Sequence, residues 1–145
     1  MLNENQLPSN TTLLLLARVL FTSLFFLSGI THFTNVPYYI DLMPEGLPGG
    51  VFWVLFSGVV ELVGATMVLL NRRARLGAWL LVIFLLPATF AVHGYEMITA
   101  EDEAMRLMQQ AHFLKGLALI RAALLVTQVG AGRNTVSEPG GGPHA

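Results

Sequence analysis

The chain contains no cysteine, which excludes disulfide bonds, thiolate metal ligands and dithiol redox chemistry carried by the chain itself. It is also poor in charge, since 12% of its 145 residues are Asp, Glu, Lys or Arg, against about a quarter in soluble domains. A formal net charge of −1 offers no basic surface for nucleic acid. We therefore expect no nucleic-acid partner.

The chain is instead rich in long apolar segments. Hydrophobic residues make up 54% of it, more than a small soluble domain could hide, because such a domain leaves much of its surface exposed. Four segments reach the roughly 20 mostly apolar residues that a spanning helix needs, at about 12–33, 50–70, 76–95 and 111–130. The alternation typical of barrel strands is missing. The sequence predicts an all-α membrane protein, a four-transmembrane-helix bundle in a lipid bilayer.

The spans divide the chain into three parts. A polar N-terminal segment at 1–11 precedes one four-helix transmembrane domain at 12–131, and the Pro- and Gly-containing tail at 132–145 is predicted to be disordered. Residues 1–12 carry no Lys or Arg, and the apolar run after them is longer than the core of a signal peptide. We expect that run to be retained as the first span.

The distribution of Lys and Arg predicts the orientation. Arg72, Arg73 and Arg75 lie in the short loop between the second and third spans, and Arg133 follows the fourth. The two longer loops are acidic, with Asp41 and Glu45 in the first and Glu96, Glu101, Asp102 and Glu103 against Arg106 in the second. We expect both termini in the cytoplasm and a multi-pass location in the cell (inner) membrane.

Both outer loops are predicted to contain helix. In the first, Pro37 suits the first turn of a short interfacial helix that runs to about Met43, with its tyrosines at headgroup level. Pro44 then helps to break it. In the second, Thr99 followed by Glu101 and Asp102 is typical of a helix start. The fourth helix is therefore expected to begin before the membrane.

Four ionisable residues lie inside the spans, namely Arg18, Glu61, Lys115 and Arg121. At a rise of about 1.5 Å per residue, Arg18 lies roughly 9 Å from the cytoplasmic side, Glu61 about 14 Å and Arg121 about 15 Å. We therefore predict a mid-membrane charge layer in which two guanidinium groups hold the Glu61 carboxylate. Such a layer either fixes helix register or receives an anionic or carbonyl-bearing ligand. In an alternative arrangement, the Arg18 side chain extends to the cytoplasmic headgroups, so that Glu61 pairs with Arg121 alone.

Three histidines lie near the outer ends of the spans, His32, His93 and His112, with Lys115 one turn deeper than His112. Three imidazoles could in principle act as ligands of Zn²⁺ or Cu²⁺, but no two of these histidines are closely spaced in sequence. We assign no metal, and hydrogen-bonded interface histidines and a ligand-lining role remain open. By helical geometry His112 lies about 180° around the fourth helix from Arg121. Both side chains can therefore point into one pocket only if the helix bends near Gly116. Otherwise one of the two faces headgroups or another subunit.

Small residues line one face of each of the first two spans. The first face contains Ser28, Gly29 and His32, and the second contains Gly58 and Glu61. Because small residues let helices approach closely, these faces are expected to meet. In the third span, Pro87 removes a backbone donor and is expected to kink the helix.

The order of these landmarks resembles DoxX-type membrane proteins over about residues 13–130. The similar positions are Arg18, Ser28–Gly29, His32–Phe33, Pro37, Pro44, Leu47–Pro48, the Ser57–Gly58–Val59–Val60–Glu61–Leu62 segment, Arg72, Arg75, Pro87, His93 and the His112–Leu119 stretch. The resemblance implies a four-helix membrane fold. Arg121 departs from it, because relatives often carry a small residue there.

The resemblance implies several functions, because the family is mixed. Some relatives resemble a subunit of a thiosulfate:quinone oxidoreductase, others associate with oxidative-stress enzymes, and distant eukaryotic ones assist receptor assembly. We expect a subunit or accessory protein of a quinone-linked membrane oxidoreductase, with quinone as the ligand, or else a non-enzymatic assembly partner of a membrane or periplasmic protein. Catalysis by the chain alone is not expected, since it shows no flavin or haem motif. Homo-oligomerisation and small-solute transport are further alternatives.

Overall fold

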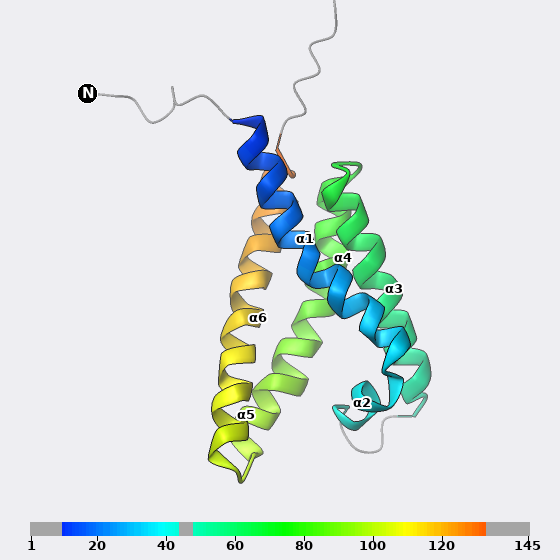
Figure 1. The fold of residues 1–145 in the computed structure, drawn as a ribbon, viewed down its shortest axis with the longest axis vertical. Helices are drawn as coiled ribbons and strands as arrows, with labels where there is room; N and C mark the ends of the chain where they lie inside the picture. Colours follow the sequence, from blue (N-terminus) through cyan, green and yellow to red (C-terminus); the bar gives the residue numbers. More distant parts are fainter. Residues whose placement is uncertain (1–9, 44–47, 133–145) are drawn as a thin grey trace, which may run out of the picture.

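The computed structural model describes residues 10–43 and 48–132, and within these ranges all regular structure is helical (Figure 1). The predicted N-terminal segment lies outside the described residues except for its last two positions. The predicted tail lies outside them after Gly132, and so does the helix-breaking Pro44. Those predictions therefore stay predictions.

Four helical stretches are long and apolar enough to cross a membrane, which confirms the predicted fold class. The elements in chain order are α1 (Thr11–Thr34), α2 (Val36–Asp41), α3 (Gly50–Leu69), α4 (Ala74–Pro87), η2 (Ala88–Gly94), α5 (Tyr95–Thr99) and α6 (Glu103–Val129). The predicted spans match α1, α3, the combined α4–η2–α5 rod and the second part of α6. The short helix predicted in the first loop is α2, with Pro37 in its first turn.

Side-chain caps explain where two of the long helices begin. Asn10 accepts hydrogen bonds from the backbone N–H groups of Thr12 and Leu13, at 2.9 and 3.2 Å, and so starts α1. Asp102 accepts from the backbone N–H of Met105 at 2.8 Å and starts α6. The fourth helix thus begins eight residues before the predicted span at 111, as the acidic loop indicated.

The third span changes its helical form at Pro87. Because proline has no backbone N–H, the regular hydrogen-bond ladder is interrupted there. The structure continues as the π-helix η2 and returns to α-helix at Tyr95. A π-helical turn accommodates an extra residue, and such turns are frequent at functional sites. The predicted disturbance at Pro87 therefore takes the form of a π-helix, which carries His93.

The helices pack in chain order, α1 on α3, α3 on α4, and α4 with η2 and α5 on α6. Glycines permit two of these contacts. A Cβ added to Gly58 would lie 3.1 Å from the backbone oxygen of Gly29, and one added to Gly77 would lie 2.7 Å from that of Gly64. The α1–α3 contact confirms that the predicted small-residue faces meet. By contrast, no Cα atom described in α1 lies within 8 Å of one in α6.

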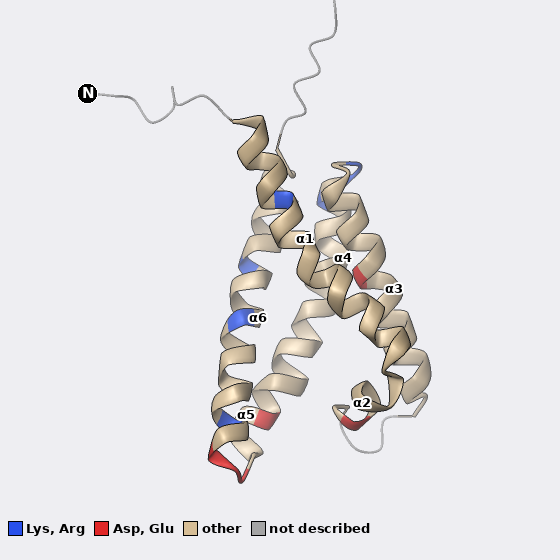
Figure 2. Cartoon of the chain, in the orientation of Figure 1, with Lys and Arg blue, Asp and Glu red and all other residues tan. Residues whose placement is uncertain are grey.

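Charges separate toward the two ends of the bundle (Figure 2). Basic residues mark the end that holds Asn10, Gly132 and the α3–α4 turn, and acidic residues gather at the end that holds α2 and the α5–α6 turn. Further basic residues lie along α6, and an acidic residue lies midway along α3 (Figure 2). This separation agrees with the sequence, in which the short loop is basic and the two longer loops are acidic.

Arg18 binds the backbone that follows α6, at the basic end of the bundle. Its Nε donates to the backbone oxygen of Ala131 at 2.6 Å, and Nη2 donates to that of Gly132 at 3.3 Å. Asn71, in the α3–α4 turn with a φ of 52°, donates from Nδ2 to the same Gly132 oxygen at 2.8 Å. The chain that follows α6 is thereby tied to α1 and to the α3–α4 turn.

Candidate functional site

Glu61 is the most unusual residue of the interior. It lies on α3 with no exposed surface, among the largest fully buried side chains of the described chain. Its Oε2 accepts a hydrogen bond from Ser28 Oγ at 3.2 Å and lies 3.1 Å from His32 Nδ1. Its Oε1 is buried and has no hydrogen-bond partner among the described residues. A buried polar atom without a partner is unfavourable and calls for a functional explanation.

His32 connects this carboxyl to the end of the bundle that carries α2. Its Nδ1 lies 2.9 Å from the backbone oxygen of Ser28 as well as near Glu61. A carbonyl oxygen can only accept, so Nδ1 carries the proton and donates. The imidazole is 5% exposed and stacks on the ring of Tyr39, with centroids 3.8 Å apart, while Phe84 meets it edge-on. The imidazole therefore lies between two aromatic rings.

A second polar connection runs from Ser28 to the short helix α2. The hydroxyl of Thr31 donates to the backbone oxygen of Ser28 at 2.7 Å. It therefore accepts from Tyr39, whose hydroxyl lies 2.6 Å away. Ser28, Thr31, His32, Tyr39 and Glu61 form one network, which we call the Glu61 cluster. It extends from the buried carboxyl to α2.

The predicted charge layer is wrong in its pairing. Glu61 contacts Ser28 and His32, whereas the guanidinium of Arg18 binds backbone oxygens beyond α6. Arg121 lies on an exposed face of α6 and makes no ion pair within the described residues. The structure thus brings Glu61 together with one predicted outer histidine instead of the two arginines.

The reason is helix register. The predicted depths start from the end of each span and assume that every helix enters the membrane at its first residue and runs straight across. The close approach of Gly29 to Gly58 sets the true register. Arg18 is eleven residues from that crossing, roughly 16 Å along α1, whereas Glu61 is three residues from it, roughly 5 Å along α3.

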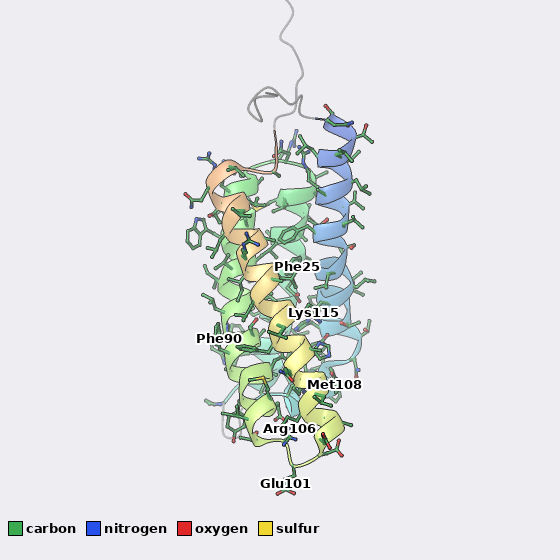
Figure 3. The ribbon with its side chains drawn as sticks, turned by 90° about the vertical axis from the view of Figure 1, so that its left-hand side faces the viewer. Phe25, Phe90, Glu101, Arg106, Met108 and Lys115 are labelled. Atoms are coloured by element: carbon green, nitrogen blue, oxygen red, sulfur yellow. The ribbon has the colours of Figure 1, made fainter. Side chains whose placement is uncertain are left out.

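The other two predicted histidines form a second cluster between η2 and α6. His93 and His112 stack with centroids 5.1 Å apart. His93 Nδ1 lies 2.8 Å from Gln109 Oε1, and Lys115 Nζ lies 3.0 Å from His112 Nδ1. An ammonium group has only donors, so it donates and His112 Nδ1 accepts. In Figure 3, Lys115 lies farther from the acidic end of the bundle than Arg106 and Glu101.

The second cluster does not have the composition of a metal site. It contains two imidazoles and an ammonium group, whereas a zinc site takes three or four protein ligands. No group of three or more His, Asp or Glu suited to a metal ion occurs in residues 10–43 and 48–132. His32 belongs to the Glu61 cluster, so the three predicted histidines do not form one ligand set.

A cleft of about 890 Å³ opens between α2 and the η2–α5 segment. Its walls are largely apolar, and they include the aromatic residues Phe90, Tyr95 and Phe113 and the acidic residues Asp41 and Glu96. None of the lining residues that the structure describes is basic. The cleft is therefore suited to an apolar or cationic group and not to an anion.

Two members of the Glu61 cluster, Tyr39 and Ser28, could not be recognised as site residues from their residue types alone. Tyr39 was expected to rest at headgroup level, and its stacking on His32 was not anticipated. Ser28 was part of a small-residue face, and its hydrogen bond to Glu61 was not anticipated either. The available signal was the spacing of Ser28 and His32, four residues apart on one face of a helix that had to meet Glu61.

Comparison with known proteins places residues 13–94 within the model of the DoxX family, which matches more than half of the chain. The matched region contains the whole Glu61 cluster and ends at the last residue of η2. No curated protein and no solved structure matches the chain.

Proposed function

The chain belongs to the DoxX family of membrane proteins, and on that premise we propose that it is a subunit or accessory protein of a quinone-linked membrane oxidoreductase system. The observation that carries the proposal is the Glu61 carboxyl, which is fully buried and has one oxygen without a partner. Reduction of a quinone takes up electrons and protons together. A protonatable group inside the membrane is the contribution that this chain can make.

One group of the Glu61 cluster suits a quinone carbonyl. The hydrogens of His32 Nδ1 and Ser28 Oγ are already donated within the cluster, whereas Glu61 Oε1 has no partner and becomes a donor when it is protonated. A bound quinone would supply the electron-accepting chemistry. Electrons must come from another protein, because the chain has no cysteine and shows no flavin or haem motif.

The chain's own part is to hold and move a proton. Once Nε2 of His32 has gained a proton from the side of α2, the imidazolium can release the proton on Nδ1 to Glu61 Oε2 over the 3.1 Å contact. A proton on Glu61 also removes the unfavourable charge beside the unpartnered Oε1. Ser28 holds the carboxyl in place through its hydroxyl.

We propose the orientation of the bundle in the membrane from the positions of its basic residues. Basic residues at the end that holds Asn10 and Gly132 support a cytoplasmic position for both termini in the cell (inner) membrane (Figure 2). The α2 end then faces outside, and protons reach His32 from that side.

The test compares Glu61→Gln with the matched control Glu103→Gln, which changes an exposed carboxyl in the first turn of α6. Each variant is purified in native lipid, its bound quinone is measured after extraction, and quinone reduction is followed in membranes. We expect the wild-type protein to carry quinone, and we expect Glu61→Gln to slow reduction at least tenfold while Glu103→Gln has no effect. Absence of quinone together with an unchanged rate in Glu61→Gln would contradict the proposal.

The same membranes distinguish the alternative role in assembly. If deleting the chain lowers the abundance of another membrane protein while Glu61→Gln leaves quinone reduction intact, the chain acts as an assembly partner. Loss of reduction in Glu61→Gln at a normal abundance of the other proteins supports the redox role.

A further inference from the structure

Arg121 lies on α6 where the helix crosses the apolar core of the membrane. It precedes Val129, the last residue of α6, by eight residues and so lies roughly 12 Å from that end. Lys115, near the other end of the apolar part of α6, is six residues away. The bulk of the bilayer therefore surrounds Arg121 on both sides along the helix.

The side chain of Arg121 points away from the bundle. The buried residues of α6 share one face toward α4 and η2, and they are Gln109, Gly116, Ile120, Ala123 and Thr127. Arg121 lies roughly 130° around the helix from the middle of that face. The residues one turn before and after it, Leu117 and Leu125, are exposed. Arg121 is thus a single cation on an apolar outer surface.

The part of the chain that the structure describes gives Arg121 neither a hydrogen bond nor an ion pair. A charged group facing hydrocarbon is unfavourable unless it is paired or hydrated. The planar guanidinium forms its best pair with a carboxylate, through two parallel hydrogen bonds. The surface therefore calls for an acidic group at the same depth.

A second copy of this chain cannot supply that group. Glu61 is the one acidic residue in the apolar segments 12–33, 50–70, 76–95 and 111–130 of the sequence. It is fully buried and paired with His32 on another helix, so it cannot reach a neighbouring molecule. The carboxylate must come from a different protein.

We propose that α6 docks through Arg121 onto a transmembrane helix of a different protein that carries Asp or Glu near mid-membrane. The surrounding leucines supply the apolar contact, and the charge pair fixes the depth of the partner helix. This surface is separate from the Glu61 cluster, so the inference does not rest on the proposed redox function.

The test uses synthetic transmembrane helices as probes, because their chemistry is defined. A leucine-rich peptide with one central Asp is compared with the same peptide carrying Asn or Leu there, and binding to the fluorescently labelled protein is measured by energy transfer in vesicles. We expect the Asp peptide to bind at least tenfold more tightly than the Leu peptide, which corresponds to about 1.4 kcal/mol. Moving the Asp two turns toward either end is expected to abolish the preference.

Two variants control for charge and folding. Arg121→Leu removes the cation from an exposed position, so the fold is expected to persist by circular dichroism, and the preference for Asp is expected to disappear. Lys115→Leu removes another exposed cation of α6 and is expected to leave the preference intact. Equal binding of all peptides to the wild type, as when Arg121 reaches lipid phosphates, would overturn the proposal. So would an Asp preference that survives Arg121→Leu, or cross-linking that shows an Arg121-dependent dimer.

Discussion

At the scale of single residues, Glu61 and His32 depend on each other. The carboxyl has no exposed surface, and its two hydrogen-bonding neighbours are Ser28 and His32. Breaking a buried pair by removing one partner is unfavourable, because the other charge is left without compensation. The pair should therefore behave as a unit when it is mutated.

We predict that His32→Ala lowers the free energy of unfolding by about 3 kcal/mol. Adding Glu61→Gln in the same chain should recover at least half of that loss, since the amide carries no charge. The measurement is reversible unfolding of the purified protein in mixed micelles, with His112→Ala as the control because His112 is only half-buried. Equal destabilisation in the single and the double variant would show that the two residues are not coupled.

The sequence could identify these residues but not their pairing. His32 and Glu61 both stand out as polar groups in apolar segments, yet simple depth counting assigns them to different layers. The pairing depends on the crossing of α1 and α3 near Gly29 and Gly58, which brings His32 alongside α3. Helical periodicity shows which residues share a face of one helix, but it does not show the tilt or register of two packed helices.

At the scale of elements, the α3–α4 contact shows how closely the backbones approach. A Cβ on Gly77 would lie 2.7 Å from the backbone oxygen of Gly64, and one on Gly64 would lie 2.9 Å from that of Gly77. Backbone atoms cannot turn aside as a flexible side chain can. The helices would have to move apart to admit even one methyl group.

We predict that Gly77→Ala destabilises the bundle by about 2 kcal/mol, the usual effect of overpacking. Gly50→Ala is the matched control, because its added Cβ would meet Ile40 at an ordinary 3.6 Å. Thermal unfolding of both variants in the same detergent gives the comparison. Equal melting temperatures for the two variants would contradict the close α3–α4 contact.

The helices themselves were largely predictable, and their exceptions have physical causes. Four apolar segments gave four spans, and the acidic start of α6 at Asp102 followed from the preference of helix N-termini for carboxylates. Pro87 indicated a disturbance, but periodicity does not encode its form as the π-helix η2, which packs against α6. That packing brings His93 next to Gln109 and His112.

At the scale of the whole molecule, the proposed direction in the membrane rests on the separation of charge between the two ends of the bundle (Figure 2). The chain has no cysteine, so single cysteines can report the side on which a loop lies without background labelling. We predict that Glu101→Cys reacts with a membrane-impermeant maleimide in intact cells, whereas Arg72→Cys reacts only after permeabilisation. The opposite pattern would place the acidic end in the cytoplasm and reverse the proposed proton path.

The measurement closest to the central claim observes the proton on Glu61 directly. Infrared difference spectra are recorded on the protein in lipid as a bound quinone is reduced and reoxidised. We predict a carboxyl stretching band that changes with the redox state and is absent from Glu61→Gln but present in Glu103→Gln. A spectrum with no such band, or one that Glu61→Gln leaves unchanged, would contradict the claim that the buried carboxyl exchanges a proton with quinone chemistry.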